Sequence, residues 1–106
     1  MEATLTVPVQ KVKTLDQVRA FLRAHAEEFR SRHMMTVDGV FGSFARGEQT
    51  EESDVDLLVS FERLPALWTF YGLADELETH LGRRVHLVHN DGGPFVAGAR
   101  RELVKP

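Results

Sequence analysis

The sequence predicts a small α/β (α+β) domain, in which helices pack against a mixed β-sheet in the order α-β-β-α-β-α. The chain has 106 residues, the length of one compact domain. Its composition, 42% hydrophobic and 27% charged, is that of a folded globular protein. Segments with helical spacing of apolar residues alternate with segments of period two. We therefore expect a single domain over residues 1–106, with an extended arm at 1–13 and a C-terminal turn and short helix at 90–106.

Composition and charge exclude several classes of protein. The chain has no cysteine, which excludes a disulfide scaffold, a thiolate zinc site and a cysteine nucleophile. The formal net charge of −3 disfavours direct binding to nucleic acid, which usually requires a basic surface. The apolar runs are too short to span a bilayer, and the first residues lack the pattern of a signal peptide. We expect a cytoplasmic protein with no membrane partner.

Two longer helices are predicted from apolar spacing and from their end signals. The first runs from about Leu15 to Arg32, with Thr14 as N-cap and Asp16 in the first turn, where the helix dipole favours an acid. The second has Pro65 in its first turn and apolar residues at intervals of three and four. Gly82 is placed to end it in the left-handed conformation.

Three strands and a last helix complete the prediction. The strands are Met34–Phe41, Val55–Phe61 and Val85–His89, and the second of them alternates in the period-two pattern. The polar stretch Glu48–Ser53, which contains three glutamates, joins the first two strands as a loop, called the acidic loop below. A short helix over Phe95–Leu103 closes the chain.

The first chemical motif, Gly42-Ser43-Phe44-Ala45-Arg46-Gly47, directly follows a strand. A glycine at this turn lets backbone amides approach a ligand, and Ser43 adds a hydroxyl. Amides at the start of a short helix suit phosphate oxygens. The motif lacks the Gly-Lys-Ser/Thr ending of a Walker A loop. On its own, Gly-Ser after a strand is usually just an ordinary turn.

The second motif is the pair Asp54 and Asp56 at the start of the next strand. Residues two apart in a strand point the same way, with Cα atoms roughly 6.6 Å apart. Two carboxylates so placed repel each other, and a hard divalent cation would relieve that repulsion. The alternative is a solvated strand end at which Asp54 caps the acidic loop.

Together the two motifs resemble the signature of the minimal nucleotidyltransferases, a family of the DNA polymerase beta-like nucleotidyltransferase superfamily. That signature is Gly-Ser-x-Ala-Arg-Gly, a spacer, and Ser-Asp-x-Asp-Leu. The resemblance covers Thr14 to about His89 and implies the nucleotidyltransferase fold. The matching residues are Gly42, Ser43, Ala45, Arg46, Gly47, Ser53, Asp54, Asp56 and Leu57.

The resemblance implies a metal-dependent transfer of a nucleotidyl group from a nucleoside triphosphate, with ATP as the expected donor. Asp54 and Asp56 would be the catalytic residues and the ligands of Mg²⁺, or of Mn²⁺. Gly42 and Ser43 would bind the phosphates. Arg46 has two interpretations, a phosphate contact or an ion pair within the acidic loop.

The sequence departs from the family at the third carboxylate, which usually lies on the next strand. His86 takes that place in Val85-His86-Leu87-Val88. Three interpretations are open: His86 ligates a softer ion such as Mn²⁺, it serves as general base, or the site has lost activity. Each of them requires His86 to face the same side of the sheet as Asp54 and Asp56.

The resemblance also implies a partner, because minimal nucleotidyltransferases are commonly paired with a HEPN toxin. They act as its antitoxin, and members of the family attach AMP to the toxin. The alternative function is an antitoxin that neutralises by binding only. A transferase for small molecules such as aminoglycosides is disfavoured, because no second domain is present to shape a pocket. Trp68 and Phe95 are either core residues or part of a partner surface.

Overall fold

The computed structural model describes residues 11–106, so the arm predicted for 1–13 lies outside the described residues except for its last three. The helices and strands, in chain order, are α1 (Leu15–His33), β1 (Met35–Phe41), α2 (Gly42–Arg46), β2 (Val55–Phe61), α3 (Leu67–Leu81), β3 (Val85–His89), the 3₁₀-helix η1 (Pro94–Val96) and α4 (Ala97–Arg101).

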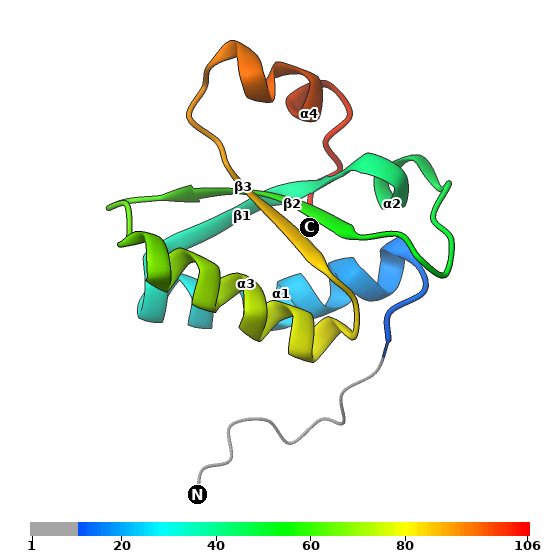
Figure 1. Ribbon diagram of the computed structural model, residues 1–106, viewed down its shortest axis with the longest axis horizontal. Helices are drawn as coiled ribbons and strands as arrows, with labels where there is room; N and C mark the ends of the chain where they lie inside the picture. Colours follow the sequence, from blue (N-terminus) through cyan, green and yellow to red (C-terminus); the bar gives the residue numbers. More distant parts are fainter. Residues whose placement is uncertain (1–10) are drawn as a thin grey trace, which may run out of the picture.

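The sheet has the order β1-β2-β3, with β1 antiparallel to β2 and β2 parallel to β3. Helix α3 is the crossover between the two parallel strands, as a parallel pair requires. Helices α1 and α3 cover one face of the sheet, and the segment with η1 and α4 lies on the other (Figure 1). The predicted mixed sheet with packed helices is confirmed, and α2 is an additional element that the predicted order omitted.

Helix α1 begins at a capping box and ends at a residue in the left-handed conformation. Thr14 forms a capping box with Gln17, which confirms the predicted start. The helix continues to His33 and ends at Met34, which adopts the left-handed conformation with φ 54°. The prediction that Met34 opens the strand is therefore wrong, and β1 begins at Met35.

Helix α3 starts two residues after the predicted proline, since Ala66 is its N-cap and Pro65 lies outside the helix. Gly82 ends it with φ 71°, as predicted. The helix predicted over Phe95–Leu103 is instead split into η1 and α4 and ends at Arg101. Neither of these short helices has a side-chain cap.

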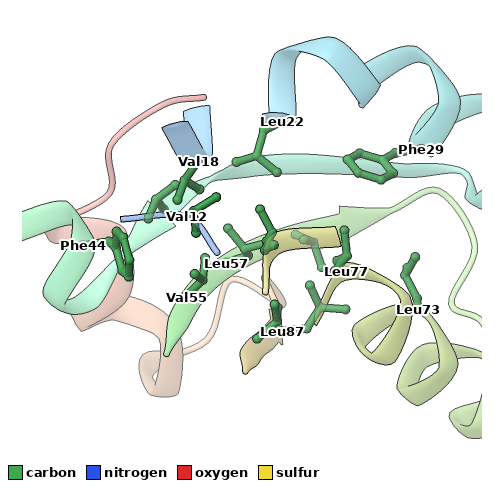
Figure 2. Packing of buried hydrophobic residues seen from close by; sticks show 14 of the residues in the cluster. Val12, Val18, Leu22, Phe29, Phe44, Val55, Leu57, Leu73, Leu77 and Leu87 are labelled. Carbon is green, nitrogen blue, oxygen red and sulfur yellow. The ribbon is translucent and has the colours of Figure 1, made fainter. Parts of the chain in front are cut away.

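The main core lies between the sheet and the layer of α1 and α3 (Figure 2). Leu57 of β2 is fully buried there with Leu22 of α1 and Leu77 of α3. Leu58 points to the opposite face of β2 and is also fully buried. Val96 of η1 is only 2% exposed. The C-terminal segment therefore gives the second face of the sheet a cover of its own. Burial of each such side chain contributes about 1.5–3 kcal/mol.

Six large hydrophobic side chains remain exposed among the described residues: Met34, Leu64, Leu67, Trp68, Tyr71 and Phe95. Trp68 is 79% exposed and Phe95 is 92% exposed, so the interpretation that every aromatic residue belongs to the core is wrong. None of the helices within residues 11–106 combines the length and the apolar character that crossing a membrane would need.

Candidate active site

The register of the sheet brings the candidate residues together at one end of the three strands. Phe41, the last residue of β1, is paired with Asp56 of β2, and Asp56 is paired in turn with His86 of β3. Gly42 follows Phe41 directly, so it lies next to Asp56. Residues separated by more than forty positions in the chain are thereby brought to one place.

Two features of this arrangement favour glycine at position 42. Its φ of +76° lies in the left-handed region, and a Cβ added there would collide with Oδ2 of Asp56. The turn therefore packs its backbone directly against the carboxylate. Ser43 is the next residue of α2, and its carbonyl accepts a hydrogen bond from the N–H of Glu48 at 2.9 Å.

Asp56 is the most buried carboxylate of the pair, and its surroundings alter its acidity. Burial raises the pKa of this carboxyl, the hydrogen bond with His86 opposes that rise, and the charge of Asp54 adds to it. Nδ1 of His86 lies 3.2 Å from Oδ1 of Asp56. This contact confirms that His86 faces the same side of the sheet as Asp56.

Asp54 has the more exposed side chain of the two and lies in the stretch that leads into β2. Its Oδ1 accepts a hydrogen bond from Nε of Arg84 at 3.2 Å. Arg84 precedes β3, and the N–H of Val55 donates to its carbonyl at 2.9 Å. The start of β2 and the start of β3 are thus joined by both backbone and side chain.

Arg46 makes ion pairs on both sides of its guanidinium group. Its Nε donates to Glu48 at 2.9 Å, and its Nη1 donates to the two carboxylate oxygens of Glu102 at 3.0 and 3.2 Å. These hydrogen bonds, to Glu48 first and Glu102 second, raise the pKa of Arg46. The predicted pairing within the acidic loop is present, and a second acid from the C-terminal segment joins it.

Glu102 was not identified from the sequence as a site residue. Its Oε2 also accepts a hydrogen bond from the backbone N–H of Gly42 at 2.8 Å. No local pattern marks it, because 56 residues separate it from Arg46 along the chain. Only the path of the C-terminal segment across the sheet places it there.

Arg83 is the second residue that the sequence analysis missed. It is buried, and its guanidinium lies 5.0 Å above the ring centre of Phe44. Its Nε donates to the carbonyl of Val12, and its Nη1 donates to the carbonyls of Thr50 and Ser53 at 2.9 Å. Arg83 therefore fixes the end of the acidic loop, directly before Asp54.

We expect Arg83→Met to lower the free energy of unfolding by about 2–4 kcal/mol, because it leaves several carbonyls without their charged donor. Urea denaturation measures this change. The matched control is Arg84→Met, which removes an exposed ion pair and should cost less than about 1 kcal/mol. Equal losses in the two variants would show that Arg83 has no special role in holding the loop.

The carboxylates of Asp54 and Asp56 have the donor chemistry that a divalent metal ion prefers. Within residues 11–106, no three histidine or carboxylate side chains are already gathered as a metal site. Asp54 and Asp56 place two carboxylates, which are hard oxygen donors, near the start of β2. Mg²⁺ is often held by one or two carboxylates together with substrate phosphates, and these residues fit that pattern. The binding and catalytic roles of Asp54, Asp56, Gly42, Ser43 and Arg46 stay predictions.

Comparisons with known proteins assign the chain to a family. The family model of the nucleotidyltransferase domain matches residues 22–105. The chain belongs to this family of nucleotidyltransferase domains, which supports nucleotidyltransferase activity. A solved structure described provisionally as a minimal nucleotidyltransferase superimposes with a TM-score of 0.71 at 38% identity. The superposition covers 89% of this chain and 97% of the chain in that structure.

Curated relatives narrow the comparison to one kind of transferase. The chain is 49% identical over 75 residues to the protein adenylyltransferase MntA of Thermococcus cleftensis, covering 71% of this chain and 76% of the relative. It is 38% identical over 78 residues to a protein of Methanocaldococcus jannaschii that is named provisionally as a protein adenylyltransferase. That match covers 74% of this chain and 91% of the relative.

Proposed function

We propose that this protein is a metal-dependent protein adenylyltransferase, which transfers AMP from ATP to a hydroxyl group of a HEPN toxin and thereby acts as its antitoxin. The observation that supports it most directly is the packing of Gly42 against Asp56, with His86 on the other side of that carboxylate. The likeness to proteins named as protein adenylyltransferases favours a protein acceptor over a small molecule.

Different residues bind the triphosphate and the metal ion that accompanies it. The N–H of Gly42, the hydroxyl of Ser43 and the guanidinium of Arg46 are the donors for the triphosphate. Asp54 and Asp56 would hold Mg²⁺, or Mn²⁺, together with the phosphates. When bound, the metal would polarise the phosphate and stabilise the charge that develops on the leaving group.

The transfer step is an exchange of one bond for another at the α-phosphorus. The acceptor oxygen forms a bond to this atom, and the bond from the α-phosphorus to the oxygen that bridges to the β-phosphate breaks. Pyrophosphate carries away that oxygen and its electron pair. The hydroxyl proton passes to Asp56 or to His86, and from there to water. These two side chains are hydrogen-bonded to each other.

The test combines the purified protein, ATP labelled at the α-phosphate, Mg²⁺ or Mn²⁺, and a purified HEPN toxin. Label on the HEPN protein supports the proposed function. Neutralisation of the toxin without label supports the second candidate below. If the HEPN protein is neither labelled nor neutralised, both candidate functions are contradicted.

The second candidate is an antitoxin that acts by contact alone, and one exposed surface favours it. Leu67, Trp68 and Tyr71 are more than half exposed, and Tyr71 follows Leu67 by four positions and Trp68 by three, so it adjoins both of them on the surface of α3. Exposed aromatic and aliphatic groups gathered in this way are typical of protein interfaces. Helix α3, which carries this group, lies on the opposite side of the sheet from the segment with η1 (Figure 1).

We expect Trp68→Ala to weaken the complex with the HEPN protein about 30-fold, since a central tryptophan often contributes about 2 kcal/mol or more to binding. The folding stability should hardly change, because the side chain is 79% exposed. Calorimetric titration measures the affinity. The control is Phe95→Ala, an exposed aromatic on the other side of the sheet. A larger loss for Phe95→Ala would move the interface to the C-terminal segment.

A further inference from the structure

Glu102 occupies the donors that the proposed function gives to the triphosphate. Its Oε2 lies 2.8 Å from the N–H of Gly42, and both its oxygens lie within 3.2 Å of Nη1 of Arg46. We call these two donors, the Gly42 N–H and the Arg46 guanidinium, the anion cradle. A single carboxylate from the C-terminal segment satisfies both of them.

A carboxylate and a phosphate make the same demands on such donors. Both are anions that accept short, charge-assisted hydrogen bonds, and a guanidinium binds either of them. The N–H of Gly42 is a single donor, so it cannot serve Glu102 at 2.8 Å and a phosphate oxygen together. The pKa of Glu102 is lowered by the Gly42 N–H first and by Arg46 second, so its ionised form is the one held.

The attachment of the C-terminal segment allows the carboxylate to leave. Val104 is joined to Val40 of β1 by two backbone hydrogen bonds of 2.8 Å, which fix the chain two residues beyond Glu102. Gly39 permits this approach, because a Cβ there would collide with the carbonyl of Val104. The Glu102 side chain itself is one-third exposed, so rotation about its own bonds moves it into solvent while the backbone bridge stays intact.

We propose that Glu102 is an internal competitor for the triphosphate, and that its carboxylate must leave the anion cradle before the nucleotide phosphates bind there. This inference rests on the proposed function for the identity of the ligand. It makes the free protein self-inhibited, and it predicts that loss of the Glu102 charge tightens phosphate binding. Arg46 is then released from one acid and keeps only Glu48.

The test measures calorimetrically the binding of inorganic tripolyphosphate, without metal, and of ATP with Mg²⁺. It compares the wild type with Glu102→Gln and Glu48→Gln. Glu48 is the matched control, since it pairs with Arg46 at 2.9 Å and makes no hydrogen bond to Gly42. We expect Glu102→Gln to bind tripolyphosphate about tenfold more tightly and Glu48→Gln at most about threefold. In the wild type, tripolyphosphate should shift the amide resonance of Gly42, which needs no variant.

Several results would overturn the inference. These are equal affinities in the wild type and Glu102→Gln, an equal gain in Glu48→Gln, or no shift of the Gly42 resonance in a wild type that binds. Weaker binding by Glu102→Gln would make Glu102 a residue that positions the cradle or ligates the metal. Binding of neither ligand by any variant would overturn the inference and the proposed function together. Tighter binding by Glu102→Gln without adenylyl transfer in any variant would support the inference and contradict only the proposed function.

Discussion

Asp56→Asn is expected to abolish adenylyl transfer, with a loss of at least about 100-fold in rate. Asp56 is the carboxylate against which the Gly42 turn packs, and the amide that replaces it carries no charge to bind a divalent ion. Transfer of the labelled AMP group and calorimetric titration with Mg²⁺ measure the two losses. Wild-type values in both assays would remove Asp56 from the site.

The folding stability of the same variant serves as its control. Burial raises the pKa of Asp56, so its ionised form destabilises the folded state at any pH above that raised pKa. Asparagine removes this cost and can still accept a hydrogen bond from His86. We therefore expect the metal-free variant to be at least as stable as the wild type in urea at pH 7. A lower stability would mean that lost activity reflects unfolding.

The pH dependence of metal binding follows from the same carboxyl group. A proton and a metal ion compete for Asp56, and its raised pKa moves this competition to a higher pH than for an ordinary aspartate. Affinity for Mg²⁺ should fall as the pH drops through that raised pKa, and recover above it. The affinity of Asp56→Asn should lack this dependence.

His86→Asp is expected to raise Mg²⁺-dependent adenylyl transfer, on the order of tenfold, because it places a hard oxygen ligand beside Asp56. Nδ1 of His86 lies 3.2 Å from Oδ1 of Asp56, and its side chain is largely exposed, so the shorter acid can be accommodated. The rate and the Mg²⁺ concentration needed for half of it are measured together. The metal-free protein should lose some stability through repulsion with Asp56.

The control for this exchange is His86→Asn, which removes the imidazole and adds no charge. If activity has been lost with the third carboxylate, His86→Asn should leave transfer low and His86→Asp should raise it. If His86 is the general base or a ligand of Mn²⁺, both variants should fall below the wild type, or their preference should move from Mn²⁺ to Mg²⁺. The two hypotheses thus predict opposite signs in one assay.

Local sequence signals determined most of the secondary structure. β2 and β3 have the predicted limits, since buried apolar residues recur at period two in both segments. Thr14 and Gly82 mark helix ends where predicted, because a side-chain oxygen at the start and a missing Cβ at the end act through their own neighbours. The motif spacing likewise led to the family, which the matching family model confirms.

Only the tertiary structure decided the remaining features, because they depend on residues that are distant in the chain. Met34 takes a left-handed conformation that no local pattern marks. The burial of Leu58 follows from the cover that the C-terminal segment provides. Arg83 and Glu102 read in the sequence as ordinary charged residues. Arg83 is buried under the acidic loop, because the fold presents carbonyl groups to its guanidinium. Glu102 is hydrogen-bonded to Gly42, because the fold presents an N–H and the guanidinium of Arg46 to its carboxylate.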